Sequence, residues 1–288
     1  MPARYINPYT DFGFKKLFGE EANKDLLIDF LNSVLPPKHQ IQTLTFQNTE
    51  NLPDSPVDRR AVFDIACESS TGEKFIVEMQ KAKQHYFRDR ALFYAAYPIL
   101  RQAQKGDWNY QLKAVYFVGI LDFEYDTSEE RRKFLREVSL KDQDGDEFSD
   151  KLHIFFLQMP FFTKSESELT SRKDKWSYFL KHLEDFEQIP AILREPVFER
   201  AFATAEYVKL PLPEQEKYEQ ELKIYRDNYS VLDTAHMEGW LEGEAAGLEK
   251  GKIEGKIETA RNLKRFGVDR ETIAKATGLP VGEIDRLD

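Results

Sequence analysis

The segment that decides the fold reads AVFDIACE over residues 61–68, SSTG over residues 69–72 and EKFIVEMQ over residues 73–80. Both eight-residue runs are rich in β-branched and aromatic side chains, which favours strands. The loop Ser70-Thr71-Gly72 ends in glycine, as is typical of a type I turn followed by a left-handed residue. We therefore predict an antiparallel hairpin in which Ser69 pairs with Glu73. This register sets Asp64 directly opposite Glu78.

A helical region is expected before the hairpin. Residues 14–35 place apolar side chains mostly at helical spacing, Gly19 can divide the run into two helices, and a Pro-Pro pair at 36–37 ends it. Thr10 or Asp11 is well placed to be the N-cap of the first helix.

The segments around the hairpin complete an α/β pattern. Residues 41–48 alternate like a strand, and a proline-rich loop follows at residues 52–58. Residues 84–105 predict a helix, which Pro98 could kink. Residues 112–121 are almost continuously apolar and predict an interior strand covered on both faces. The order helix, three strands, helix, strand is consistent with a core in which an antiparallel hairpin precedes a crossover.

The remaining sequence is mostly helical in pattern. A further strand is expected within residues 152–159, and helices are expected at residues 176–183, 190–208 and 214–232. We expect three regions: a core at 1–160, a helical extension at 161–235 and a glycine-rich tail at 236–288.

The tail differs in kind from the rest of the chain. Glycine recurs every four residues among Glu, Lys, Ala and Leu, at Gly239, Gly243, Gly247, Gly251 and Gly255. Glycine costs about 1 kcal/mol relative to alanine inside a helix, so this segment either packs closely against another helix or is a flexible stalk. Residues 261–287 suggest two short helices, either a helix-turn-helix-like unit or a small dimerising or capping unit.

Composition excludes several classes of protein. The chain has 288 residues, 41 basic and 51 acidic, and its net charge of −10 excludes a uniformly basic nucleic-acid coat protein. The single cysteine, Cys67, excludes a disulfide scaffold and a multi-cysteine metal site. No apolar run is long enough for a bilayer and the first residues lack an apolar leader, so we expect a soluble, cytoplasmic protein with no membrane partner.

The hairpin carries the residues that point to chemistry. Because alternate side chains of a strand share a face, Glu78 and Gln80 point together, and Asp64 shares that face across the hairpin. Opposed carboxylates about 4.5–5.5 Å apart at Cβ repel each other unless a cation lies between them. Mg²⁺ or Mn²⁺ suits such oxygen ligands, and the main-chain carbonyl of Met79 could add another. Such a cation can polarise a phosphoryl oxygen and acidify an attacking water.

The alternative is that both carboxylates are solvated on an outer face of the sheet. The neighbouring side chains argue for a buried sheet, in which unpaired carboxylates are costly: Phe63, Ile65, Ile76 and Val77.

Several separated blocks of the chain resemble one known family. The blocks are TDFGFKKLFG at 10–19, LIDFLN at 27–32, FDIAC at 63–67, FIVEMQ at 75–80 and RALFY at 90–94. They are similar, in this order, to the Rpn-type recombination-promoting nucleases, also known as transposases, of the PD-(D/E)XK nuclease superfamily. The resemblance is specific over roughly residues 5–125 and weaker toward the C-terminus.

The resemblance implies a restriction-endonuclease-like core, a central mixed sheet flanked by helices, and metal-dependent cleavage of DNA. By position, it assigns Asp64 and Glu78 as metal ligands and places Gln80 where the wider superfamily usually has lysine. Glutamine cannot be a charged general base, although it could orient the attacking water, so the catalytic base is unassigned. Lys81 points to the opposite face unless the strand ends at Gln80.

Other residues are expected around this pair. As the helix acid of this superfamily, Asp11 could be a third acidic contributor; as an N-cap it would need no catalytic role. Gln84, Arg90 and Tyr94 could line a nucleic-acid groove, with Tyr94 alternatively packing in the core.

The local charge favours a nucleic-acid partner. Between residues 81 and 116 seven basic residues face two acidic ones, Asp89 and Asp107. The basic residues are Lys81, Lys83, Arg88, Arg90, Arg101, Lys105 and Lys113. A basic strip beside an acidic metal site is what a phosphate backbone requires.

The sequence therefore predicts a Mg²⁺-dependent DNA endonuclease, with catalytic residues Asp64, Glu78 and Gln80, and the resemblance links it to recombination or mobile elements. The five histidines lack zinc-ligand spacing, and neither a P-loop nor a Gly-x-Ser-x-Gly elbow is present. Two alternatives remain. One is an RNA-cleaving nuclease with the same chemistry, and the other is a non-catalytic binding or assembly protein that forms a homo-oligomer through its glycine-rich helix.

Overall fold

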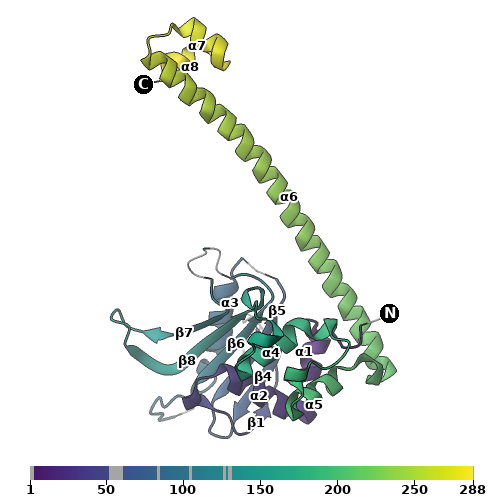
Figure 1. Ribbon diagram of the computed structural model, residues 1–288. Coiled ribbons are helices and arrows are strands. Elements are labelled where there is room, and N and C mark those ends of the chain that lie inside the picture. Colours follow the sequence, from purple (N-terminus) through teal and green to yellow (C-terminus); the bar gives the residue numbers. More distant parts are fainter. Residues whose placement is uncertain are drawn as a thin grey trace. The chain divides into compact units, whose positions relative to one another are not determined.

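The computed structural model describes residues 3–51, 61–82, 85–103, 106–125, 128 and 132–287 (Figure 1). The predicted loop at 52–58 lies outside these residues. Contacts divide the chain into two units, Met1–Lys223 and Ile224–Asp288.

A six-stranded mixed sheet forms the centre of the first unit, in the order β1-β4-β5-β6-β8-β7. The pairs β5–β6 and β6–β8 are parallel and the other pairs are antiparallel. The strands are β1 (Leu44–Phe46), β4 (Ile65–Ser69), β5 (Lys74–Gln80), β6 (Val115–Leu121), β7 (Leu135–Lys141) and β8 (Glu147–Gln158). A separate two-stranded ribbon pairs β2 (Glu50–Asn51) with β3 (Ala61–Val62). This is the mixed sheet of a restriction-endonuclease-like α/β fold, as the sequence predicts.

The predicted hairpin register is confirmed. Ile65 pairs with Val77, and the Ser69 N–H donates to the Glu73 carbonyl over 2.9 Å. Gly72 takes a φ of +94°, the left-handed conformation that glycine adopts without steric cost.

The single strand predicted over residues 61–68 is wrong in one respect. β3 ends at Val62 and β4 begins at Ile65, so Phe63 and Asp64 lie between two strands that belong to different sheets. The Phe63 N–H donates to the Thr49 carbonyl instead of to β5, which breaks the pairing.

Helix α3 (Phe87–Leu100) covers one face of the sheet, where its apolar side chains pack on Ile76, Phe117 and Phe156. It lies inside the predicted range 84–105 and contains Pro98. Val77 and Val118 belong to the opposite face, and both are completely buried. The sheet is therefore covered on both faces, as the apolar run at 112–121 predicts.

The N-terminal helical region divides at Gly19 as expected, into α1 (Asp11–Phe18) and α2 (Lys24–Val34). The Thr10 Oγ1 accepts the Gly13 N–H over 2.9 Å, so Thr10 is the N-cap and Asp11 is the first helical residue. Gly13 is required here, because a Cβ would come within 2.1 Å of the Asn7 carbonyl oxygen.

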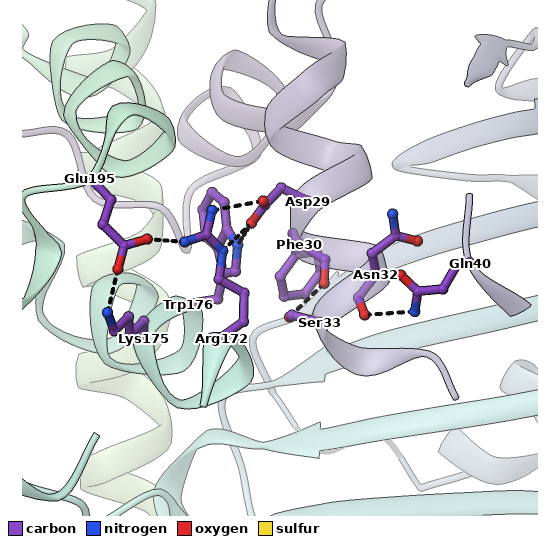
Figure 2. Close-up of polar contacts among 9 residues, drawn as sticks. All are labelled: Asp29, Phe30, Asn32, Ser33, Gln40, Arg172, Lys175, Trp176 and Glu195. Atoms are coloured by element: carbon purple, nitrogen blue, oxygen red, sulfur yellow. Dashed lines mark hydrogen bonds and ion pairs between the residues drawn. The ribbon is translucent and has the colours of Figure 1, made fainter. Parts of the chain in front are cut away.

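A buried-to-surface network joins α2 to the helices that follow the sheet, α4 (Arg172–His182) and α5 (Pro196–Ala205). Asp29 accepts two hydrogen bonds of 2.8 Å from Arg172 and one of 2.6 Å from the Trp176 indole (Figure 2). Glu195 accepts from Arg172 and Lys175. The bidentate pair between Arg172 and Asp29 therefore holds α4 against α2.

The C-terminal half contains more regular structure than its sequence pattern predicts. The strand expected at 152–159 begins at Glu147, and its antiparallel neighbour β7 was not predicted. The helix expected at 176–183 begins at Arg172, and the one expected at 190–208 is confined to α5 with short 3₁₀ turns on both sides. The short 3₁₀ turns are Glu21–Asn23, Pro37–His39, Met159–Phe161, Glu166–Glu168, Leu183–Asp185, Ala191–Leu193 and Tyr207–Lys209.

Helix α6 (Leu212–Arg265) runs without a break through all five spaced glycines. A Cβ built on any of them meets no atom within 4 Å, so the described chain supplies no packing partner for this face. The strong helix formers between the glycines, with i,i+4 pairs such as Lys250–Glu254 at 3.8 Å, explain why the glycines are tolerated.

The two short C-terminal helices are confirmed as α7 (Arg270–Thr277) and α8 (Val281–Asp285). Ile273, Leu279 and Ile284 form a small core with Ala260 of α6. Helix α8 has only five residues and carries Glu283 and Asp285, which suits a capping unit better than a DNA-reading helix. Among the described residues, no helix has the length and apolar composition needed to cross a membrane.

Candidate metal centre

The metal centre predicted at the hairpin lies where strands β4 and β5 separate. Their ladder ends at the pair Ile65–Val77, one residue short of Asp64 and Glu78. Beyond that point, side-chain carboxylates take the place of main-chain carbonyls as hydrogen-bond acceptors. The Asp64 N–H donates to Glu78 Oε1 over 3.1 Å, and the Met79 N–H donates to Asp64 Oδ2 over 2.8 Å. The two carboxylates therefore belong to one hydrogen-bonded ring.

The main-chain carbonyl of Met79 lies on the β4 side of β5. Even-numbered residues of β5 bond to the β6 side, as the Lys74 N–H and the Gln80 carbonyl do with Ala114 and Asp122. Odd-numbered residues, and so both polar groups of Met79, point to the β4 side. Since the β4 ladder ends at Ile65, this carbonyl lies beyond the ladder, on the side of β5 where the Met79 N–H bonds Asp64.

The second carboxylate oxygen of Glu78, Oε2, contacts Gln80 and Arg90. The Gln80 Nε2 donates to Glu78 Oε2 over 3.0 Å, and an Arg90 Nη2 from α3 lies 3.9 Å from the same oxygen. Glu78 is 1% exposed and Gln80 is 8% exposed, and the hydrogen bond between them places both side chains on one face of β5, as the strand alternation predicts.

Burial makes the two negative charges costly. The pKa of Glu78 is raised to about 8, mainly by burial and then by the charge of Asp64. The pKa of Asp64 is also raised, mainly by burial, although the Met79 N–H opposes the rise. The donor set, two carboxylates and a carbonyl, fits a hard divalent cation such as Mg²⁺ or Mn²⁺. Within the described residues, no cluster of three or more His, Cys, Asp or Glu forms a metal site.

Asp11 is near this centre but is engaged elsewhere. Its carboxylate pairs with Lys15 over 3.0 Å, and its charge is close enough to raise the pKa of Asp64. Lys15 and Lys81 lower the same pKa. Strand β5 ends at Gln80, so Lys81 is not constrained by strand alternation to the opposite face.

A cavity of about 450 Å³ opens beside Asp64, between α1, β1 and the first turns of α6. Lys15, Lys16 and Lys217 line it, and Lys16 is paired with Glu20 at 3.0 Å and Glu214 at 2.8 Å. Sequence reasoning did not find these lysines. Lys15 carried one signal, its i,i+4 spacing from Asp11, whereas Lys217 is two hundred residues away along the chain.

The groove residues predicted on α3 are placed as follows. Arg90 reaches Glu78, and its guanidinium lies 5.0 Å from the centre of the Tyr94 ring. The Tyr94 ring also packs edge-on against Phe63 at 5.2 Å, so it belongs to the core as well. Gln84 lies outside the described residues.

Comparison with known families gives a match over most of the chain. The model of a family described as PD-(D/E)XK nuclease family transposase matches residues 8–235. These residues include all the strands and the complete candidate centre. No curated protein matches the chain, and no solved structure matches it.

Proposed function

The chain belongs to the PD-(D/E)XK nuclease family transposases, and from this premise we propose that it is a Mg²⁺- or Mn²⁺-dependent endonuclease that hydrolyses phosphodiester bonds of DNA. The observation that carries the proposal is the hydrogen-bonded ring through Asp64, Glu78 and Met79. It joins the two carboxylates at the end of the β4–β5 ladder, and Met79 belongs to the same ring. A role in recombination or in mobile elements is part of this proposal and rests on the family alone.

Asp64, Glu78 and the Met79 carbonyl would hold the cation. A divalent cation there supplies polarisation of a phosphate oxygen and acidification of the attacking water. Arg90 brings a positive charge beside Glu78, where it can contact a phosphate. Gln80 is held by Glu78, and its side-chain carbonyl can accept a hydrogen bond from a water and so orient it.

The experiment that tests the activity uses supercoiled plasmid DNA and, in parallel, single-stranded RNA. The purified chain is incubated with each substrate in Mg²⁺, Mn²⁺ or EDTA. We expect nicked and linear plasmid with either cation and none in EDTA. If the protein cleaves only RNA, its substrate is RNA and not DNA. If it cleaves neither substrate, the proposed enzymatic activity is contradicted.

Replacing Gln80 by alanine is expected to lower kcat about 10- to 100-fold, with KM little changed. The side chain would orient a water only during the reaction, and positioned proton-transfer partners contribute at about this level or above. Single-turnover cleavage measures the effect, with Gln143→Ala as a matched control, because Gln143 is exposed and lies outside the candidate centre and both cavities. A rate within twofold of wild type would remove Gln80 from the proposed mechanism.

We further propose that the glycine-rich part of α6 associates with a second copy of itself in antiparallel orientation. Residues 238–249 contain four glutamates and no basic residue, whereas residues 250–265 contain six basic and two acidic residues. An antiparallel pair sets the net −4 half of one helix against the net +4 half of the other. Trp240 and Leu241 are 60% and 53% exposed, and the glycines leave room for a neighbouring backbone.

The molar mass in solution tests this association. Light scattering after gel filtration is expected to give a dimer at low salt that weakens as salt screens the charges. A monomer at all protein and salt concentrations would contradict it. Replacing Trp240 by alanine should weaken the dimer without affecting cleavage per chain.

A further inference from the structure

A second cavity, of about 440 Å³, lies between the C-terminal part of α3 and the hairpin β4–β5. Its lining includes Lys74, Tyr97, Arg101, Gln111 and Lys113. Neither the family match nor the metal centre accounts for it.

The cavity and the metal centre lie at opposite ends of one face of β5. On β5, Lys74, Ile76 and Glu78 share a face because their spacing is two residues. Four residues of strand span about 13 Å, which is about four times the 3.4 Å rise of one nucleotide along a stacked strand.

Helix α3 packs over this face of β5 and spans the same distance. Arg90, Tyr94, Tyr97 and Arg101 are spaced by four, three and four residues, so they share one helix face. Arg90 is beside Glu78, Tyr94 and Tyr97 both pack on Phe63, and Arg101 lines the cavity. Phe63 and Ile76, which are 3% and 1% exposed, fill the space between α3 and β5, so a strand reaches the cavity along its rim. There Gln47 and Ala66 line both this cavity and the cavity beside Asp64.

The cavity has a local positive charge in a protein of net charge −10. Lys74, Arg101 and Lys113 line it together with one carboxylate, Glu68, which pairs with Lys74. The Arg101 guanidinium is held in place by the Tyr97 hydroxyl, which accepts from its Nε at 2.9 Å and its Nη2 at 2.6 Å. Fixed cations of this kind suit a phosphate.

Groups that suit a base lie beside these cations. The Tyr97 ring, with Arg101 5.1 Å from its centre, is only partly buried, and aromatic rings stack on unpaired bases. The side-chain amides of Gln47, Asn48 and Gln111 also line the cavity, and amides can pair with base edges. The volume suits one small ligand, whereas a base inside a duplex could not enter.

From this arrangement we infer that the cavity binds one unpaired nucleotide of the DNA strand whose scissile phosphate lies at Asp64 and Glu78. This inference rests on the proposed nuclease function and specifies its substrate: DNA with an unpaired stretch beside the bond that is cut. The three cations hold the nucleotide's phosphate, and Tyr97 and the amides hold its base.

The test is a binding measurement in EDTA, so that it does not depend on cleavage. Fluorescence anisotropy compares a labelled DNA hairpin carrying a single-stranded tail with a blunt hairpin of the same stem. Wild type is expected to bind the tailed hairpin at least tenfold more tightly. The variant Lys113→Gln is expected to lose about five- to tenfold for the tailed hairpin and to change less than twofold for the blunt one.

The matched control is Lys141→Gln, which removes the same charge from an exposed position on β7. It should leave both affinities within twofold of wild type. Equal binding of tailed and blunt hairpins by wild type, or equal losses in the two variants, would overturn the inference. A protein that binds the tailed hairpin more tightly than the blunt one but cleaves no DNA would instead overturn the proposed function. The two failures are therefore distinguishable.

Discussion

Replacing Asp64 by asparagine is expected to lower the rate of DNA cleavage at least a thousandfold while leaving the protein folded. The asparagine carbonyl can still accept the Met79 N–H that Asp64 Oδ2 accepts at 2.8 Å, so the end of the hairpin keeps its hydrogen bond. What is lost is one of the two charges that would hold the cation. A neutral amide is a much weaker ligand for a hard divalent ion.

The measurement is single-turnover cleavage in saturating Mn²⁺, together with a thermal melt of each protein. Asp107→Asn is the matched control, because Asp107 is exposed and lies outside the centre. It should cut at the wild-type rate. Equal cleavage by the Asp64→Asn variant and wild type would mean that the acidic pair is not the catalytic centre.

Replacing Glu78 by glutamine is expected to abolish cleavage and, unusually for a buried position, to stabilise the protein at alkaline pH. The pKa of Glu78 rises from 4.5 to about 8 on folding, so between these values the folded state binds more protons than the unfolded state. Wild type therefore loses stability as the pH rises through this window. Glutamine carries no charge and escapes the loss.

The amide also fits the local hydrogen bonds. Its carbonyl can accept the Asp64 N–H, and its NH₂ can donate to Gln80 once the Gln80 side-chain amide turns over. The stability gain is expected to be near zero below pH 4.5 and to approach about 5 kcal/mol above pH 8, since the pKa rises by about 3.5 units and each unit corresponds to about 1.4 kcal/mol.

Urea unfolding in EDTA at pH 5 and pH 8.5 measures the difference. The exposed Glu271 of α7 provides the control, because Glu271→Gln should change stability equally at both pH values. A Glu78→Gln variant that is destabilised by the same amount at pH 5 and pH 8.5 would show that Glu78 is not a strained, buried acid.

The sequence predicts the hairpin well because local chemistry determines it. The glycine at the left-handed position of the turn sets the register, and the register places Asp64 opposite Glu78. The strand break at Phe63 and Asp64 could not be predicted. It depends on a side chain replacing a main-chain acceptor for Met79, and strand periodicity carries no signal for such an exchange.

Long-range features were also missed, for a different reason. β7 is an edge strand whose sequence, LREVSLK, mixes charged and apolar residues, so its hydrophobic pattern is weak. Trp176 of α4 meets Phe18 and Phe30 in the core, although about 150 residues separate it from either of them along the chain. The cavity that Lys217 shares with Asp64 likewise requires the tertiary structure. Periodicity identifies which faces are buried, but it does not identify which buried faces meet.

The proposed metal centre is tested by soaking a crystal of the chain in Mn²⁺ and recording anomalous diffraction at the manganese edge. We expect one strong anomalous peak bound by carboxylate oxygens of Asp64 and Glu78 and by the Met79 carbonyl. A fully occupied peak elsewhere, or none at Mn²⁺ concentrations that support cleavage, would contradict it.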